Sequence, residues 1–352
     1  MKHVKAVMMS ILILVGMVAC SSATKENNEP RHPSRASASK EVRSKNAAAT
    51  GTTGLSIPED LEEQVSATNA LTATLLKKAE KTAPPTVKAV INHPSFCTGT
   101  EKKMDFTSLG LVTPVKDQNV DSSGKPVLCG SCWAFASNAV LESSYLALRK
   151  ENVSASEQEL VSCSSAGTCA RGGWWAFGFL QKQGIESESN YPYEGQDSLC
   201  KSPLNTEFRI LPTDYLIQDA KQVRTAVPSD TDLKQALCAH GPLAVAFRAT
   251  TNFTSFGDAH HDSSVFEEND PGPINHALVI VGWDETGPSP AWIVKNSWGQ
   301  EWGEKGFVRI RYGTNHIGQG AAWAEAWPKD YSPAPSVRAA FVQSKKHSKS
   351  KK

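Results

Sequence analysis

The sequence lacks a strong excess of either charge. Its 352 residues carry 37 Lys and Arg against 36 Asp and Glu, so the formal net charge is +1. Proteins that bind nucleic acid or another polyanion by electrostatic attraction usually carry a clear positive excess. The lysine-rich end of the chain, residues 345–352, is more simply explained as part of a solvated basic tail at 332–352. We therefore expect no nucleic-acid partner.

The sequence also lacks an apolar run long enough to cross a bilayer. Residues 6–19 are apolar and follow the basic start MKHVK, but a spanning helix needs about 20 such residues. A short apolar run after a basic start is typical of an export signal. The run ends in small residues before Cys20 (VACSS), as at the cleavage site of a bacterial lipoprotein. We predict a signal at 1–20 and a lipid anchor on Cys20 in a bacterial cell envelope. The alternative is an ordinary signal and a secreted or periplasmic protein.

Clusters of metal-ligating residues are scarce. One Cys-x-x-Cys is present at 129–132, but the sequence contains neither a second one nor a His-x-His pair, and zinc sites are usually built from such clusters. His260 and His261 stand beside Asp262, where a surface loop is favoured over a metal site. We predict no metal and no cofactor. The eight cysteines and 39% hydrophobic residues instead describe a globular domain that keeps disulfides in an oxidising compartment.

The chain before residue 100 divides into two parts. Residues 21–54 are rich in Ser, Ala, Asn, Thr and Lys and poor in large apolar side chains, which predicts a disordered tether. Residues 55–99 begin with the capping-box spacing Ser56 to Glu59 and end their helical pattern at 83–85 (APP). The apolar positions that would form one helix face are Leu61, Val65, Leu75, Leu76 and Ala79. This part is predicted to be a short helical pro-segment or a linker.

The stretch 129–135 (CGSCWAF) opens the clearest helical pattern in the sequence. Residues 131–148 contain no Gly or Pro, and their apolar residues recur as in a core helix. Cys132 would lie on the first turn, where free N–H groups and the helix dipole favour a thiolate. Cys132 is therefore a candidate nucleophile. The alternatives are an inert buried thiol, a disulfide partner and a redox or metal pair with Cys129.

Residues 129–135 resemble the nucleophile helix of papain-like cysteine peptidases, in which a His follows about 130–150 residues later. Three further motifs follow the same order as in that family: TPVKDQ with Gln118, NHALVIVG with His276, and KNSWG with Asn296 and Trp298. The resemblance extends from about residue 105 to 328.

The resemblance implies an α+β, two-lobed fold at 100–331. Its helical left half would occupy about 115–213 and its β-barrel-like right half about 214–331, with the active-site cleft between them. Four strand-like runs fit the right half: 241–247, 277–281, 291–295 and 306–310.

The resemblance also implies a chemistry, the hydrolysis of peptide bonds by a thiol. Cys132 would attack the peptide carbonyl and form an acyl-enzyme, with His276 as its ion-pair partner, base and acid. Asn296 would orient the imidazole, and Trp298 would shield that hydrogen bond. The Gln118 side chain and the Cys132 N–H would hold the oxyanion. Residues 119–128 lengthen the path from Gln118 to the helix. An inserted surface loop would leave Gln118 in place, whereas a changed chain path would move it.

Substrate contacts are implied at two places. Gly172 and Gly173 resemble the glycine pair whose backbone binds an extended peptide, although a simple Gly-rich turn is the alternative. Glu325 falls near the residue at the base of the pocket for the second substrate residue, where it would admit basic side chains. A solvated carboxylate is the alternative and the favoured one.

The remaining cysteines fit structural disulfides. By resemblance Cys129 pairs with Cys169 and Cys163 with Cys200. Sequence alone fixes no connectivity. Cys97 and Cys238 are left over, and a bond between them would fasten the segment before the peptidase domain to its right half.

Two functions of different class are compatible with these motifs. The first is an active thiol peptidase, expected to be an endopeptidase because no inserted loop of the kind that blocks exopeptidase clefts is evident. The second is a silent peptide-binding or inhibitory protein on the same fold. Silent members generally lack the Cys or the His, and this sequence has both.

Overall fold

A computed structural model describes residues 53–82, 93–201, 206–211 and 213–328. The chain divides into two compact units, 1–34 and 35–352, and every described residue belongs to the second. The predicted signal, Cys20, most of the tether and the basic tail lie outside the described residues. No helix within the described ranges is both long and apolar enough to span a bilayer.

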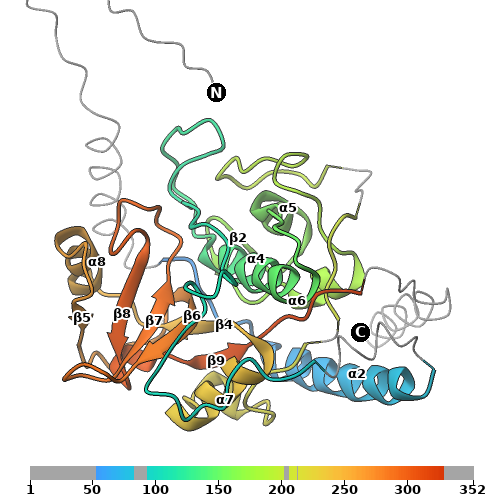
Figure 1. Cartoon of the computed structure of the whole chain (residues 1–352). Helices are drawn as coiled ribbons and strands as arrows, with labels where there is room; N and C mark the ends of the chain where they lie inside the picture. Colours follow the sequence, from blue (N-terminus) through green and yellow to red (C-terminus); the bar gives the residue numbers. More distant parts are fainter. Residues whose placement is uncertain (1–52, 83–92, 202–205, 212, 329–352) are drawn as a thin grey trace, which may run out of the picture. The chain divides into compact units, whose positions relative to one another are not determined.

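The helical half surrounds one buried helix, α4 (Figure 1). All residues of α4 are buried, and most of them are apolar or small; the exceptions, Asn138 and Glu142, are buried polar side chains. The predicted helix reached residue 148, but the α-helix ends at Ser144 and continues as a π-helical turn until Lys150 adopts a left-handed conformation (φ 58°). The described helices and helical turns are α2 (Leu61–Thr82), α4 (Cys132–Ser144), η1 (Tyr145–Arg149), α5 (Glu157–Cys163), α6 (Phe177–Lys182), η2 (Gln222–Arg224), α7 (Asp230–His240), α8 (Thr251–Ala259) and η3 (Thr314–His316).

The other half is a mixed sheet of seven strands in the order β5-β8-β7-β6-β4-β9, with β1 paired to β6. All neighbours are antiparallel except β5 and β8. Each strand-like run predicted from the sequence overlaps a strand here. The strands are β1 (Lys103–Asp105), β4 (Leu243–Phe247), β5 (Val265–Phe266), β6 (His276–Asp284), β7 (Ala291–Lys295), β8 (Phe307–Arg311) and β9 (Gln319–Ala322); β2 (Gly167–Thr168) and β3 (Gly172–Gly173) form a separate hairpin.

This arrangement confirms the predicted α+β fold and refines its second half. The described strands form an open path from β5 to β9 and do not close into a barrel. Helix α4 packs against β6 and β4, so the first turn of α4 and the start of β6 come together where the two halves meet. The candidate site lies at this junction.

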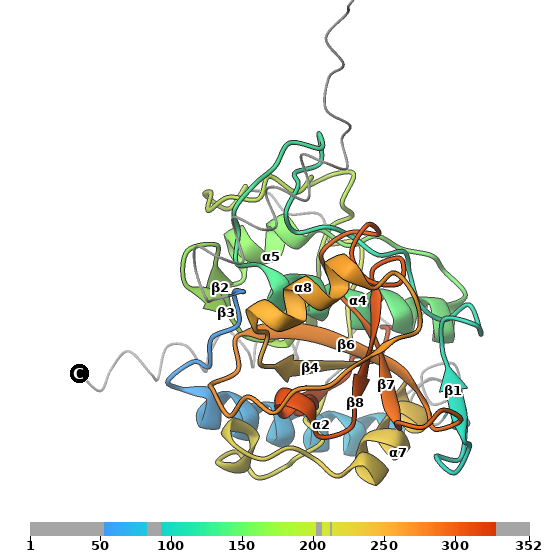
Figure 2. The ribbon, with the colours of Figure 1, turned by 90° about the vertical axis from the view of Figure 1, so that its left-hand side faces the viewer.

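Helix α2 packs against the chain that leads into the sheet half. Leu61 and Val65 are completely buried, as the predicted apolar face requires. The Thr72 hydroxyl donates to the Thr213 carbonyl at 2.9 Å, and the Asn69 amide donates to the Gln218 carbonyl at 3.1 Å. The helix begins at Leu61 and not directly after Ser56, because the Ser56 N–H is bonded to the Gly173 carbonyl instead. Figure 2 shows α2 and α7 on the same side of the sheet.

Candidate active site

Cys132 is the first residue of α4 and its side chain is completely buried. It is the one free cysteine among the described residues. Backbone amides of Trp133 and of Ala277, at the start of β6, lie close enough to its sulfur to favour the thiolate. The thiol therefore lies where the nucleophile helix meets the strand that begins at His276.

The His276 imidazole is held from one side only. Its Nε2 lies 2.8 Å from Asn296 Oδ1, and because an amide oxygen only accepts, Nε2 carries the proton. The Trp298 ring stacks on the imidazole with centroids 4.6 Å apart. His276 Nδ1 is buried and has no hydrogen-bond partner among the described groups. The ring therefore presents an unprotonated, unoccupied nitrogen at the start of the strand that also brings Ala277 to the Cys132 sulfur.

Gln118 is fixed between the two halves. Its side-chain amide donates to the Cys129 carbonyl at 3.1 Å, and its side-chain oxygen accepts from the Ser297 hydroxyl at 2.7 Å. Its backbone N–H donates to the Ser297 carbonyl at 2.8 Å. These contacts hold Gln118 beside the residues that precede Cys132 and follow Asn296.

Residues 119–128 form a compact surface loop. Val120 bridges to Pro126, and the Asp121 carboxylate accepts the Lys125 N–H at 2.9 Å. The Ser122 N–H donates to the Tyr193 carbonyl in the helical half. The extra residues are thus taken up by a self-bonded surface loop, which is the first of the two alternatives for this stretch.

A segment from outside the peptidase domain lies over this site. We call residues 53–57 the covering segment. Leu55 pairs with Gly173 as a parallel bridge, with Ser56 N–H donating to the Gly173 carbonyl at 3.0 Å and Gly173 N–H donating to the Gly54 carbonyl at 2.9 Å. The Leu55 N–H and the Thr53 hydroxyl both donate to the Asn275 carbonyl. The last residues of the predicted tether and the first of the predicted pro-segment are therefore bound beside the catalytic candidates.

The backbones meet so closely that only glycine fits. A Cβ on Gly54, whose φ is +107°, would lie 2.1 Å from the Gly130 carbonyl oxygen. A Cβ on Gly172 would lie 2.2 Å from the Gly54 carbonyl oxygen. Leu55 itself joins the apolar cluster that contains Cys132.

Burial keeps both reactive groups neutral in this covered arrangement. Loss of solvent raises the pKa of the Cys132 thiol to about 12. The same effect lowers the pKa of His276 to about 4, although the Asn296 hydrogen bond opposes it. In this buried arrangement the thiolate–imidazolium pair predicted from the sequence is thus disfavoured.

The family model of the papain family cysteine protease matches residues 100–324. The chain belongs to the papain family of cysteine proteases. It is 34% identical over 214 residues to digestive cysteine proteinase 3 of Homarus americanus, which covers 59% of this chain and 60% of that protein. It is 35% identical over 209 residues to zingipain-2 of Zingiber officinale, which covers 58% of this chain and 85% of that protein.

A solved structure agrees with the sequence comparison. The bromelain protease from Ananas comosus, in complex with the E64 inhibitor, matches with a TM-score of 0.53 and 28% identity and covers 64% of this chain and 99% of that one. The chain nevertheless spans only 60% of the lobster proteinase and 58% of pro-cathepsin H from Medicago truncatula.

Glu325 has a partner that the sequence did not indicate. Its carboxylate lies 2.9 Å from His240 Nδ1 at the end of α7, and the His240 ring stacks on Trp323 at 4.0 Å. The pocket-base prediction for Glu325 therefore gains no support from the structure.

Sequence reasoning also missed Asn275. Its carbonyl accepts from the covering segment, and the only available signal was its position next to His276. His260 and His261 are exposed and directly follow α8, which ends at Ala259; His261 Nδ1 lies 3.1 Å from the Gly303 carbonyl, so the surface-loop interpretation stands.

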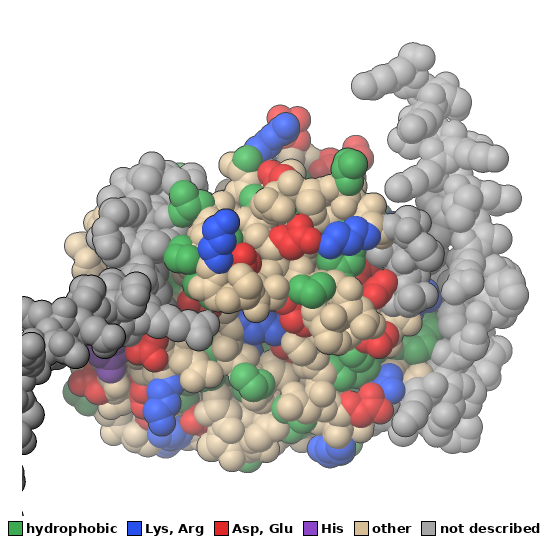
Figure 3. Space-filling model, turned by 90° about the horizontal axis from the view of Figure 1, so that it is seen from above, with side chains coloured by type: hydrophobic (Ala, Val, Ile, Leu, Met, Phe, Trp, Pro, Cys, Tyr) green, Lys and Arg blue, Asp and Glu red, His purple; other side chains and the backbone are tan. Residues whose placement is uncertain are grey.

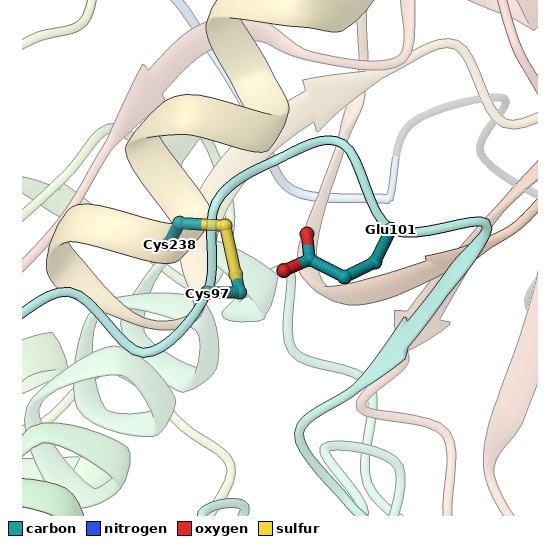
Figure 4. A group of neighbouring side chains, drawn as sticks. All are labelled: Cys97, Glu101 and Cys238. Carbon is teal, nitrogen blue, oxygen red and sulfur yellow. A yellow bond between two sulfur atoms is a disulfide. The ribbon is translucent and has the colours of Figure 1, made fainter.

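Three disulfides form among the described residues of this papain-family chain. Two are the pairs that the resemblance implied, and the third joins the two cysteines left over. They join Cys129 to Cys169, Cys163 to Cys200 and Cys97 to Cys238. Glu101 approaches the last of these, as Figure 4 shows. The two sulfurs are bonded to each other, so neither is a thiolate that could hold a metal ion. Glu101 instead accepts the Thr98 N–H at 2.9 Å.

Proposed function

We propose that the chain is a thiol-dependent peptidase in which Cys132 is the nucleophile and His276 the base and acid. Attack of the sulfur on the peptide carbonyl transfers the thiol proton to His276 Nδ1. The imidazolium then gives this proton to the leaving amine, and water later hydrolyses the thioester. The single observation that carries this proposal is the His276 ring, protonated towards Asn296 and unoccupied at Nδ1, at the strand start that meets Cys132.

Two donors would hold the oxyanion. One is the Cys132 N–H, at the start of α4, and the other is the Gln118 side-chain amide, fixed through Cys129 and Ser297. Donors fixed before the reaction stabilise the developing charge without reorganisation, and removal of one typically costs about 3 kcal/mol in the barrier.

The substrates are peptides or proteins bound along Gly173. The covering segment supports this, because a peptide-like stretch of the chain already forms backbone hydrogen bonds with Gly173 and Asn275. The chain continues from both ends of this stretch, so the contact line accommodates a polypeptide that does not end there. This favours an endopeptidase. Charges of both signs are interspersed on the face in Figure 3, which gives no support to a polyanionic partner.

The covering segment makes the full chain a latent form. Leu55 of this segment shares an apolar cluster with Cys132, and in this covered arrangement burial disfavours the charged forms of both reactive groups. Residues 55–99 are then a pro-segment and not only a linker. Helix α2 fixes the segment through the buried Leu61 and Val65.

Export is the proposed destination, with lipidation of Cys20 as the anchor. The three disulfides support an oxidising compartment. The VACSS motif supports the anchor. Metabolic labelling with a fatty acid, compared between the wild type and Cys20→Ser, tests the anchor; an unlabelled wild type overturns it.

A peptide library tests the activity. The full chain is incubated with the library before and after limited proteolysis, beside Cys132→Ala treated identically. We expect cleavage by the wild type, rising after proteolysis, and none by Cys132→Ala. Binding without cleavage in both proteins would establish the silent alternative.

A further inference from the structure

A group of charged side chains and one threonine lies behind the proposed catalytic residues, buried except for Lys116, whose side chain is 24% exposed. Lys116 Nζ donates to Glu142 Oε1 at 2.8 Å and to Glu157 Oε1 at 2.8 Å. Lys295 Nζ donates to the Thr113 carbonyl at 2.8 Å and lies 3.1 Å from the Thr113 hydroxyl. That hydroxyl in turn donates to Glu142 Oε2 at 2.8 Å. We call these five residues the interlobe network.

Three members of the interlobe network are attached to parts of the active site. Glu142 lies on α4, the helix that begins at Cys132. Lys295 is the last residue of β7 and directly precedes Asn296. Lys116 lies two residues before Gln118, and its carbonyl accepts the Gly299 N–H at 3.1 Å. The network therefore connects the helix of the nucleophile, the strand of the imidazole's partner and the loop of the oxyanion donor.

The network is too deeply buried to be a surface feature. Glu142 and Glu157 are each 1% exposed and Lys295 is 5% exposed. Burying such charges costs several kcal/mol each unless their partners are well placed, so an apolar core would stabilise the fold at least as well. A charged network instead adds directional hydrogen bonds that form in only one geometry. These bonds fix the position of one half relative to the other.

A small cavity lies between the network and the site. Its volume is about 20 Å³. One half of its lining residues is apolar, from α4 and β6, and the other half is polar: Asn296, Ser297, Lys116, Glu142, Glu157 and Lys295. This is room for about one water, and a buried water needs two to four polar partners. Asn296 Nδ2 is buried without a hydrogen-bond partner among the described groups, so it is a donor that a water in this cavity could satisfy.

We propose that the interlobe network, with one water in this cavity, positions Asn296 and thereby sets the alignment of His276 with Cys132. The network acts through Asn296 and touches neither substrate nor sulfur, so its members are positioning residues. The inference rests on the proposed function for its kinetic readout. Its spectroscopic readout does not require activity.

Three variants perturb the network to different degrees. Thr113→Val removes only the hydroxyl between Lys295 and Glu142 and leaves every charge in place. Glu142→Gln and Lys295→Met each remove one charge. The matched control is Glu159→Gln on α5, because Glu159 is also 1% exposed and also accepts a backbone N–H, from Glu186 at 2.7 Å, but does not line the cavity.

The first measurement is made on the latent full chain by NMR. The His276 Nε2–H, identified by its loss in His276→Ala, exchanges slowly while Asn296 holds it. We expect its exchange to accelerate at least about tenfold in Thr113→Val and in the charge variants, and to stay unchanged in Glu159→Gln. Equal exchange in all folded variants overturns the proposal. Thr113→Val keeps the test available if a charge variant does not fold.

The second measurement is peptide hydrolysis by the proteolysed chain. A misalignment of about 1 Å can cost about 100-fold in rate. We expect kcat to fall by about that factor in the network variants with KM within about twofold, because substrate contacts are untouched. A fall that matches Glu159→Gln and follows thermal stability would show a purely structural role. An inactive wild type would instead refute the proposed function. The hydrogen-exchange measurement alone would then test whether the network positions Asn296.

Discussion

Gly54 is a position at which the proposed covered form could be opened without touching the proposed catalytic residues. Its φ is +107°, and a Cβ added there would lie 2.1 Å from the Gly130 carbonyl oxygen, which leaves no room for a side chain. We predict that Gly54→Ala displaces the covering segment. A left-handed conformation costs alanine about 1 kcal/mol. An added methyl group in a packed site costs about 1–3 kcal/mol more.

The combined penalty of about 2–4 kcal/mol acts on the covered state alone, because an uncovered segment can relax. Since each 1.4 kcal/mol is a factor of ten, the uncovered population should rise about 30- to 700-fold. The assay is the rate at which a small alkylating reagent labels Cys132 in the full chain. In the covered state, burial keeps the reagent away from Cys132 and disfavours ionisation of its thiol, so the labelling rate measures how often the segment uncovers the thiol.

Gly110→Ala is the matched control for this experiment. Gly110 also has a positive φ, +68°, but a Cβ there meets nothing within 4 Å. It should carry similar backbone strain and leave the labelling rate unchanged. If Gly54→Ala labels no faster than Gly110→Ala while both remain folded, the covering segment does not control access to Cys132, and the latent-form proposal fails.

Three further outcomes follow from the same structure. The pKa of His276 in the folded chain is lowered from 6.5 to about 4, so the covered form should lose up to about 3 kcal/mol of stability as pH falls from 6.5 to 4. Hydrogen exchange at the Leu55 N–H, corrected for intrinsic rates, should accelerate over this pH range. An exchange rate that does not change with pH would contradict the lowered pKa of His276. Replacing Cys97 and Cys238 together by Ser should lower stability by about 2–4 kcal/mol in thermal denaturation, and an unchanged midpoint would show that the bond adds nothing. Glu325→Ala should leave the preference between Arg and Leu at the second substrate residue unchanged, because its carboxylate is paired with His240; an altered preference would restore the pocket prediction.

The fold and the catalytic candidates could be predicted because their signals are local. Helix α4 begins at Cys132 as its motif indicated, and His276 and Asn296 meet although 20 residues separate them. The pairing of Cys129 with Cys169 followed from the resemblance in the same way.

The covering segment could not be predicted, because its hydrogen bonds come from backbone groups. Gly54 and Leu55 carry no side-chain pattern that names Gly173 as a partner, and the spacing from Ser56 to Glu59 looked like a helix cap. Gly173, which accepts the Ser56 N–H, lies more than a hundred residues away in the sequence, so rules based on neighbouring residues cannot identify it.

The interlobe network was hidden for a similar reason. Lys116 and Lys295 look like ordinary surface lysines in the sequence, since lysine is almost never fully buried unless it is paired. Only the folded arrangement of Glu142, Glu157 and Thr113 around them reveals a different environment.

The order of segments along the chain determines how the thiol would be set free. The stretch over Cys132 comes first, then α2, then the catalytic domain, so a single backbone cut between α2 and that domain would leave the stretch bound by its own contacts. The cut would convert an intramolecular contact into a bimolecular one. The effective concentration that a covalent link provides can reach about the millimolar range, and it would drop to the actual concentration of the released fragment. Dilution of the fragment after cleavage would then determine how long the thiol stays covered. A small compartment that retains the fragment would prolong that time.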